Sequence, residues 1–429
     1  MRYEPISNEL FRENRNRLVK KLAQGSLVVI HSNDILTTSG DGLLPFRQHS
    51  NFFYLTGIDQ EESSLILAPD HPDPSKREIL FIRETNDVIV TWEGPKLSQS
   101  EASDVSGINT VMWSQHFESV LDALIPEFKQ VYLDAEENPR ASKGIVHRND
   151  RFIKAFQEDH PVVDTMRLAP ILTDLRMVKS AQEVKLMEQA AEIAAKGYRT
   201  VLSTIKPGQW EYEIEGEFIR EFIGHRSRGF AYNPIIASGS NACILHYELN
   251  NRQCQNGELV LMDVGAEYAN YNSDVTRTVP VSGKFTDRQR LIYQAVLEVK
   301  NKATEILRPG KTLKEFNQEV GGIMEEALIE IGLLSAEKVK DQDPEKPLYR
   351  KYYMHSTAHH LGLDVHDMAN PHTPLAPGMI LTVEPGIYIK EESLGIRLED
   401  DMLIGDDTNT NLTESIPIEI AEIESIMSR

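Results

Sequence analysis

Cysteine and long apolar runs are scarce in this sequence of 429 residues. Its two cysteines, Cys243 and Cys254, do not form a CxxC pair. Two isolated thiols cannot build a disulfide scaffold, so the chain fits a reducing compartment. No apolar run reaches the roughly 18 residues that a membrane-spanning helix needs. The first residues are charged and lack the apolar stretch of a secretory signal, so we expect a cytoplasmic protein that does not span a membrane.

Positive charge is also in short supply. The chain has 45 Lys and Arg against 66 Asp and Glu, which gives a formal charge of −21. Such an acidic surface repels phosphate backbones, so we expect no nucleic-acid partner. The length exceeds the usual size of one hydrophobic core, which predicts two domains.

Residues 1–174 are predicted to form an α/β domain. A helical pattern at 117–126 lies among short apolar segments, and a turn rich in proline and aspartate at 69–74 joins two of these segments. The segments predicted as buried strands are 26–30, 64–68, 78–82 and 88–92.

Residues 175–429 contain the start signals of several helices. A Ser or Thr followed three residues later by Glu or Gln forms a capping box, in which each side chain accepts from the other residue's backbone N–H. A further helix is expected over 210–224, and Pro-Gly pairs at 207–208 and 309–310 mark helix ends. The capping boxes are Ser180 with Glu183, Thr286 with Gln289, and Thr312 with Glu315.

Strand-like segments follow each pair of predicted helices. The repeated order of two helices and then strands indicates an α+β domain built from two duplicated halves. Two such halves usually meet at a shared cleft, where ligands tend to bind. The predicted strands are 258–264, 273–279, 379–389, 396–404 and 417–424.

Acidic residues interrupt the apolar strands of the first half. Asp263 and Asp274 are 11 positions apart, and an unbulged hairpin folded about positions 268 and 269 would set them directly opposite each other. Opposed residues share a face with Cβ atoms about 4.5–5.5 Å apart. Carboxylates that close repel each other unless a proton or a cation lies between them. The alternative is a solvated hairpin tip with incidental acids.

The second half repeats this arrangement. Glu384 and Glu399 are 15 positions apart, and a hairpin centred on Glu391 and Glu392, with its turn at 390–393, would oppose them. Four inward carboxylates need compensating charge, and metal ions are the natural source.

A segment between these hairpins is dense in histidine, the commonest nitrogen ligand of metals and the usual proton carrier near neutral pH. It contains His355, His359, His360 and His366, four of the 13 histidines in the chain. We interpret His360 as structural. The same interpretation applies to His147, His225 and His372.

Together these segments resemble the aminopeptidase P and prolidase branch of the pita-bread metallopeptidases. The resemblance rests on LMDVGAEY, NSDVTRT, MHSTAHHLGLDVHD, TVEPGIY and GIRLED in the second domain, and on FRQHSNFFYLTG and WEGP in the first. Methionine aminopeptidases share the pita-bread fold without such an N-terminal domain. Creatinase and the histone-chaperone relatives lack the metal ligands, whereas all five ligand positions are occupied here.

The resemblance implies roles for individual residues. Asp263 would chelate one metal ion, and His359 and Glu384 a second. Asp274 and Glu399 would bridge the two ions. Glu384 would also move a proton during catalysis. The remaining positions carried over are His246, His355 and His366 as catalytic residues and Arg397 and Tyr388 as supporting residues.

The implied activity is hydrolysis of the N-terminal Xaa-Pro bond of peptides by a hydroxide held between two divalent cations. A carboxylate-rich ligand set with one imidazole and no thiolate favours Mn²⁺, although Co²⁺ or Zn²⁺ would also bind. A prolidase, which cleaves only Xaa-Pro dipeptides, is the alternative, and a non-catalytic peptide-binding scaffold is a distant one. Family members often form dimers or tetramers, so we expect a homo-oligomer.

Overall fold

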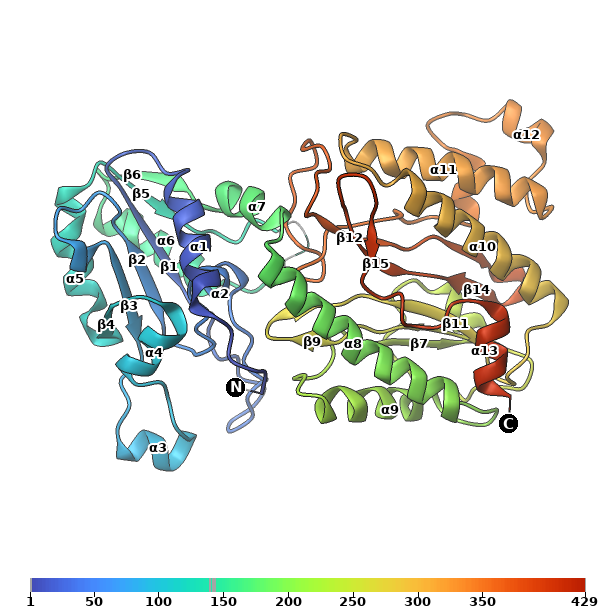
Figure 1. The fold of residues 1–429 in the computed structure, drawn as a ribbon, viewed down its shortest axis with the longest axis horizontal. Coiled ribbons are helices and arrows are strands. Elements are labelled where there is room, and N and C mark those ends of the chain that lie inside the picture. The colour runs from blue at the N-terminus through green and yellow to red at the C-terminus, as the bar shows by residue number, and fades with distance from the viewer. Residues whose placement is uncertain (1, 139, 141–143, 429) are drawn as a thin grey trace. The chain divides into compact units, whose positions relative to one another are not determined.

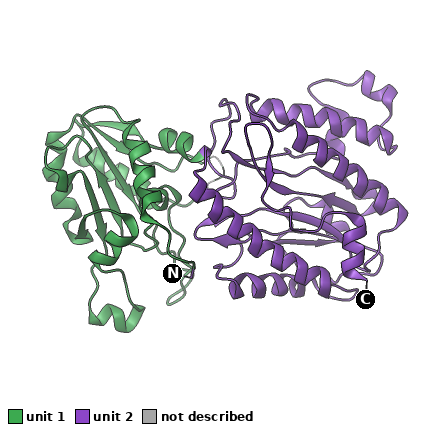
Figure 2. Cartoon of the chain, in the orientation of Figure 1, with its two compact units in different colours: residues 1, 3–176 green, residues 2, 177–429 purple. Residues whose placement is uncertain are grey.

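The computed structural model describes residues 2–138, 140 and 144–428. These residues divide into two compact units, drawn in different colours in Figure 2. The first unit comprises residues 3–176, and the second comprises residues 177–429 together with Arg2. The boundary expected after residue 174 falls inside helix α7 (Ala169–Met177), close to this division.

A six-stranded sheet forms the centre of the first unit, with strand order β4-β3-β2-β1-β5-β6. β1, β2 and β3 pair antiparallel, whereas β5 and β6 run parallel to β1 and β4 runs parallel to β3. The predicted strands at 26–30, 64–68 and 78–82 are confirmed. The strands are β1 (Ser26–His31), β2 (Ser64–Leu67), β3 (Glu78–Ile82), β4 (Thr110–Trp113), β5 (Gln130–Leu133) and β6 (Asp164–Arg167).

Helices pack around this sheet, as Figure 1 shows. The predicted helix at 117–126 is confirmed by α5. Leu121 and Leu124 of α5 join Val29 and Phe81 of the sheet in one buried core. The helices of this unit other than α3 and α7 are α1 (Asn8–Val19), α2 (Ser50–Thr56), α4 (Gln99–Ser106), α5 (Phe117–Leu124) and α6 (Arg148–Asp159).

The strand predicted at 88–92 is wrong, because this segment forms helix α3 (Asp87–Glu93). The Asn86 side chain accepts from the backbone N–H groups of Val88 and Ile89 and so caps the helix. Val88 is 67% exposed and Trp92 is 84% exposed. The apolar run therefore has no sheet to join, and the local cap decides its conformation.

Long helices form much of the second unit, and the three predicted capping boxes are all present. α8 packs against α9, and α10 packs against α11. The strand predicted at 417–424 is wrong, because α13 occupies most of it and buries Ile423 while packing against α8. The helices are α8 (Ala181–Thr204), α9 (Glu211–Gly224), α10 (Asp287–Ile306), α11 (Leu313–Glu330), α12 (Ala336–Lys340) and α13 (Ile420–Met427).

The strands of the second unit form two three-stranded sheets and two short ribbons, all antiparallel. One sheet has the order β11-β8-β7 and the other the order β12-β15-β16. The first strands are β7 (Ile235–Ser238), β8 (Leu259–Asp263), β9 (Glu267–Tyr268), β10 (Tyr271–Asn272) and β11 (Thr276–Pro280). The later ones are β12 (Ile380–Val383), β13 (Gly386–Ile389), β14 (Leu394–Arg397), β15 (Asp400–Leu403) and β16 (Thr410–Asn411). The chain thus runs twice through two long helices followed by strands, as the sequence predicts.

The predicted register of the first hairpin is wrong by two residues. Asp263 lies opposite Thr276 rather than Asp274. The turn residues are Ala269 and Asn270, which both have positive φ (53° and 67°), as the tight turns that match strand twist require. A shift of two residues keeps a side chain on the same face, so the two aspartates remain on one side.

The predicted register of the second hairpin is confirmed. Gly386 pairs with Arg397 and Ile389 with Leu394, which is the alignment expected for a centre at residues 391 and 392. Ser393 closes the turn with φ of 51°. β12 and β15 continue the same alignment. Glu384 directly follows β12 and Glu399 directly precedes β15, so the two glutamates lie at matching positions.

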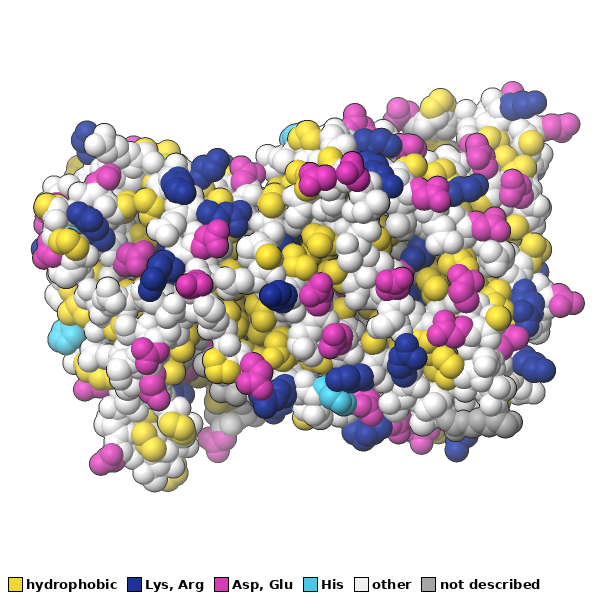
Figure 3. Space-filling model, in the orientation of Figure 1, with side chains coloured by type: hydrophobic (Ala, Val, Ile, Leu, Met, Phe, Trp, Pro, Cys, Tyr) yellow, Lys and Arg dark blue, Asp and Glu magenta, His cyan; other side chains and the backbone are white. Residues whose placement is uncertain are grey.

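The described surface carries both signs of charge. Acidic and basic side chains are interspersed over the face shown in Figure 3. Such a mixture differs from the single basic surface that attracts nucleic acids. Among the described residues, no helix combines the length and the apolar character needed to cross a lipid bilayer.

Candidate metal centre

Asp274, His359 and Glu399 form the centre of the candidate site. Each offers a ligand atom, and these atoms all lie within 4.8 Å of one another. Asp274 follows β10, His359 precedes β12, and Glu399 lies between β14 and β15, so residues from both halves meet here. Asp274 and Glu399 are buried, with 5% and 1% exposure. Two carboxylates and an imidazole in this geometry fit a divalent cation.

Glu384 lies beside this group. His359 Nε2 is 3.3 Å from Oδ2 of Asp274 and 3.7 Å from Oε1 of Glu384. Burial lowers the pKa of His359, but its hydrogen bond to Asp274 and the charge of Glu384 raise the pKa above its usual value. Because only a neutral imidazole binds a metal ion, a metal ion at this site would compete with the proton for His359.

Asp263 contacts the same site through other partners. Its Oδ2 accepts from Nη2 of Arg397 at 2.5 Å. The Tyr232 hydroxyl lies 2.5 Å from Oδ1 of Asp263 and 2.5 Å from Oδ1 of Asp274. A hydroxyl has one proton, so Tyr232 can donate fully to only one of these carboxylates at a time. Burial raises the pKa of Asp263, although the charge of Arg397 lowers it.

The electrostatics of the site reflect crowded acids. Burial raises the pKa of Glu384 to about 8, and the charges of Asp274 and Asp263 contribute in the same direction. Burial and the charge of Asp274 raise the pKa of Glu399 well above its usual value. A pair of divalent cations would offset this repulsion and keep the carboxylates ionised. The residues therefore fit the metal pair that the sequence predicts.

A chain of hydrogen bonds connects the predicted supporting residues. Arg397 donates from Nη1 to the Tyr388 hydroxyl at 2.9 Å, and this hydroxyl is 2.8 Å from Nε2 of His355. Nδ1 of His355 lies 2.8 Å from the Ser356 carbonyl oxygen and 3.8 Å from Oε2 of Glu384. Burial and the charge of Arg397 lower the pKa of His355 to about 3, so its imidazole is neutral.

The other two predicted histidines lie differently. The His366 ring is 3.9 Å from the His359 ring, centroid to centroid. His246 is exposed on the rim of an open cavity of about 760 Å³ that Trp210, Ile244 and Leu249 help to line. Its charge contributes to lowering the pKa of His355, so it lies within electrostatic range of the site.

Three residues of the site escaped the sequence analysis. Tyr232 lies in the loop before β7 and carries no motif. Thr276 donates from its hydroxyl to Oε2 of Glu399 at 2.6 Å. Asp401 accepts from the backbone N–H of Asp274 at 3.1 Å. The acidic run of Glu399, Asp400 and Asp401 was visible in the sequence, but only Glu399 was assigned a role.

The chain matches two family models. Residues 185–406 match "Metallopeptidase family M24". The chain belongs to this family. Residues 11–132 match "Aminopeptidase P, N-terminal domain", so both units of this M24 member have counterparts. The predicted fold class, an N-terminal α/β domain followed by a pita-bread domain, is confirmed.

Relatives of the same length support this assignment. The Xaa-Pro aminopeptidase of Haemophilus influenzae is 36% identical and aligns with 99% of this chain and 98% of its own. That of Escherichia coli is 35% identical, with 98% of each chain covered. Among solved structures, a putative aminopeptidase P from Bacillus anthracis has a TM-score of 0.91 at 34% identity, covering 98% of both chains. Zn-substituted E. coli aminopeptidase P in complex with product has a TM-score of 0.89 at 33% identity, covering 99% of both chains.

Proposed function

We propose that this M24 metallopeptidase is a metal-dependent Xaa-Pro aminopeptidase, which removes the first residue of peptides with proline in second position. The observation that carries the proposal is the cluster of Asp274, His359 and Glu399, which lies where the two halves of the M24 unit meet. Full-length relatives named Xaa-Pro aminopeptidase favour this activity over that of a prolidase.

Five side chains would hold two divalent cations: Asp263, Asp274, His359, Glu384 and Glu399. When bound, such a pair lowers the pKa of a shared water and stabilises the charge that develops on the substrate carbonyl oxygen. The donors are four carboxylates and one imidazole, so we propose Mn²⁺ as the native ion, with Co²⁺ or Zn²⁺ as alternatives.

Glu384 is the proposed proton carrier. Its carboxylate lies 3.7 Å from Nε2 of His359 and 3.8 Å from Nδ1 of His355, beside the proposed ligand set, where a carboxyl group could both accept and release a proton. It would accept a proton from the attacking water and deliver it to the proline nitrogen as that group leaves. His355 lies beside Glu384 and is fixed through both ring nitrogens, so it would orient Glu384 and Tyr388 towards the substrate.

His366 and His246 would contact the peptide itself. His366 packs against the proposed ligand His359, and from there it would reach a carbonyl oxygen of the substrate. A hydrogen bond to that oxygen would stabilise the tetrahedral intermediate. His246 lies further out, on the rim of the open cavity, where the peptide beyond the proline would pass. We also propose a cytoplasmic location and a homo-oligomeric state. Size-exclusion chromatography with light scattering would test the oligomeric state.

Peptide hydrolysis after metal removal tests the activity. The purified protein would be treated with a chelator, supplied again with Mn²⁺, and offered an Xaa-Pro-Yaa tripeptide and an Xaa-Pro dipeptide in parallel. We expect release of the first residue from the tripeptide only when Mn²⁺ is present. Mass spectrometry of the products identifies the bond that is cleaved.

The control is Glu399→Ala, which removes a proposed bridging ligand and should reduce turnover at low free metal by at least a thousandfold. Cleavage of the dipeptide alone would instead identify a prolidase with the same site. Turnover of Glu399→Ala near that of the wild type would contradict the metal assignment.

A further inference from the structure

The candidate metal site lies where two separate sheets meet. Asp274 comes from the segment before β11, the edge strand of the β11-β8-β7 sheet. Glu399 comes from the residue before β15, the central strand of the β12-β15-β16 sheet. β11 and β15 do not pair in a strand ladder among the described residues. The spacing between these two acids therefore depends on the hydrogen bonds that connect the halves outside the strand ladders.

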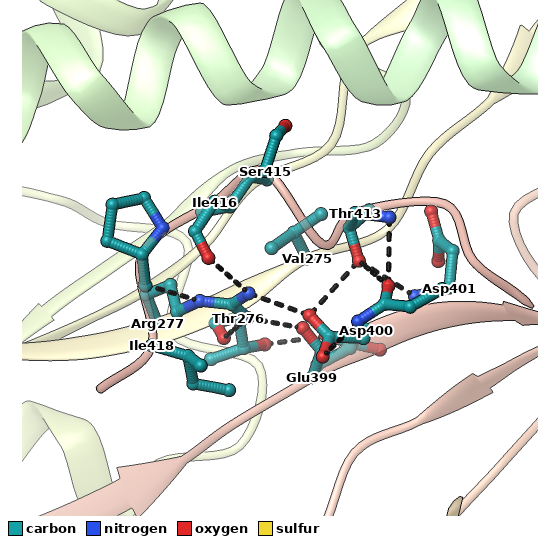
Figure 4. A network of polar contacts seen from close by, with 12 residues as sticks. Val275, Thr276, Arg277, Glu399, Asp400, Asp401, Thr413, Ser415, Ile416 and Ile418 are labelled. Atoms are coloured by element: carbon teal, nitrogen blue, oxygen red, sulfur yellow. Dashed lines mark hydrogen bonds and ion pairs between the residues drawn. The ribbon is translucent and has the colours of Figure 1, made fainter.

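Arg277 is the main connection (Figure 4). Its side chain is 1% exposed, and each of its five N–H groups has an acceptor. Nη1 donates to the carbonyl oxygens of Thr276 at 3.0 Å and Glu399 at 2.6 Å. Nη2 donates to Oδ1 of Asp400 at 2.7 Å and to the Ile416 carbonyl at 3.1 Å, and Nε donates to the Pro417 carbonyl at 2.9 Å.

Asp400, in the second half, forms an ion pair with this guanidinium. Its Oδ1 also accepts from the Thr413 hydroxyl at 3.0 Å. Its Oδ2 accepts from Asn411 Nδ2 at 2.9 Å and forms an ion pair with Lys300. All the acceptor positions of this carboxylate are engaged, and its side chain is 1% exposed. Asp400 is therefore a fixed point of the second half, to which Arg277 of the first half is attached.

Both candidate bridging acids form hydrogen bonds with residues next to Arg277 and Asp400. Glu399 N–H donates to the Thr276 carbonyl at 3.1 Å, and Glu399 Oε2 accepts from the Thr276 hydroxyl. Asp274 N–H donates to Oδ2 of Asp401, the residue after Asp400. The backbones of both acids thus move with the Arg277–Asp400 pair.

We propose that Arg277 is a positioning residue, which acts through Asp400 to set the spacing of Asp274 and Glu399 so that both can bridge the same two cations. This inference rests on the metal centre of the proposed function. The ligand atoms of a metal site must lie within about 0.5 Å of their required positions. A site whose ligands come from two sheets therefore needs a rigid connection between those sheets. The planar guanidinium provides one, whereas a lysine has three donors on a flexible stem and cannot reproduce these five bonds.

Calorimetric titration of metal-free protein with MnCl₂ tests the proposal on the full chain. The wild type should bind two ions. Arg277→Lys keeps the charge and loses the fork of donors, so we expect at least one ion to bind ten or more times more weakly. The Mn²⁺ concentration for half-maximal peptidase activity should rise by a similar factor, while KM for the peptide at saturating Mn²⁺ stays within twofold.

A matched control lies in the first unit. Arg15 is also fully buried and donates to Glu78 and to the carbonyl oxygens of Leu55 and Ser106. Arg15→Lys removes a buried guanidinium with four hydrogen bonds without touching the metal site, so its Mn²⁺ affinities should match the wild type. An equal loss of Mn²⁺ affinity in Arg15→Lys would show that general destabilisation is the cause, and it would overturn the proposal.

Asp400→Asn provides a second variant if Arg277→Lys does not fold. It keeps the size of the side chain and removes the charge that holds Arg277, and it should weaken Mn²⁺ binding in the same direction. Binding of two ions with wild-type affinities in either folded variant would overturn the positioning role while leaving the proposed function intact. A wild type that binds no pair of ions would instead overturn the proposed metal centre, and the inference with it.

Discussion

Asp400 and Glu384 are acids of one unit whose pKa values shift in opposite directions. Burial alone raises the pKa of Asp400, but Arg277 and Lys300 lower the pKa to about 2. Burial raises the pKa of Glu384 to about 8 in the absence of metal ions, although the charges of His359 and Arg397 lower it. The first residue is an ion that holds structure, whereas the second needs a cation beside it to stay ionised near neutral pH. Residue type alone does not distinguish these roles.

Asp134 in the first unit offers a test of the same principle away from the metal site. Its carboxylate is 1% exposed, accepts from Asn51 Nδ2 at 3.0 and 3.1 Å, and lies 3.7 Å from Nδ1 of His49. Burial raises the pKa of Asp134 to about 7, although the Asn51 hydrogen bond and the charge of Arg176 lower it. An unfolded aspartate has a pKa of about 3.9.

We therefore expect Asp134→Asn to stabilise the protein increasingly as pH rises. Because the folded pKa is the higher one, the contribution of Asp134 to stability is fully present below about pH 4 and is lost as pH rises through about 7. Between pH 5 and 8 the free energy of unfolding of Asp134→Asn, relative to that of the wild type, should increase by about 2.6 kcal/mol.

Urea denaturation at several pH values measures this difference. The exposed Asp104 provides the control, because Asp104→Asn changes a side chain that lies in solvent, and its difference from the wild type should stay small across the range. A pH-independent difference for Asp134→Asn would mean that Asp134 is already ionised in the folded protein at pH 5.

At the scale of elements, the pair α8 and α9 shows how close packing overrides helix propensity. Gly197 of α8 faces two buried rings of α9, and a Cβ at this position would lie 2.7 Å from Phe218 and 2.9 Å from Phe222. Gly216 of α9 is exposed, and a Cβ there would meet no atom within 4 Å. The two glycines thus differ in packing although both are helical.

Alanine at these two positions should have opposite effects. Gly216→Ala should stabilise the protein by about 0.5–1 kcal/mol, because alanine is the better helix former. Gly197→Ala gains the same propensity but forces two rings apart, and we expect a net loss of about 1–3 kcal/mol. Chemical denaturation of the two variants provides the comparison. A Gly197→Ala variant as stable as Gly216→Ala would show that α8 and α9 can separate without cost.

For the whole molecule, the candidate ligands all lie in residues 177–429, so metal binding should stabilise the second unit selectively. An ion that binds only the folded state adds about 2.7 kcal/mol when its free concentration is one hundred times Kd. We expect Mn²⁺ to slow hydrogen exchange in the core strands of the second unit and to leave the first unit unchanged. Hydrogen exchange followed by mass spectrometry, with and without Mn²⁺, measures this directly.

Glu399→Ala serves as the control for this experiment, and its exchange should not respond to Mn²⁺ at the same concentration. Equal protection of both units would contradict a metal site confined to the second one.

The sequence by itself determined what depends on neighbours along the chain. Capping boxes fix helix starts at Ser180, Thr286 and Thr312, because both partners lie within four residues. The register of the second hairpin followed from its turn for the same reason. The order of acids and histidines was enough to indicate a family and a metal chemistry. Local signals carry this much because they need no knowledge of the packing partner.

Only the tertiary structure decided what depends on distant segments. The short apolar runs at 88–92 and 417–424 fit a strand or a helix equally well, and caps and packing made both helical. The first hairpin was predicted two residues out of register because its turn lies at Ala269 and Asn270, one position later than expected. Tyr232 carries no motif, and Arg277 lies in the NSDVTRT segment without a role that the segment reveals; both reach the site because folding brings separate sheets together. Burial, which sets the charge of each acid in the site, is likewise a property of the folded chain.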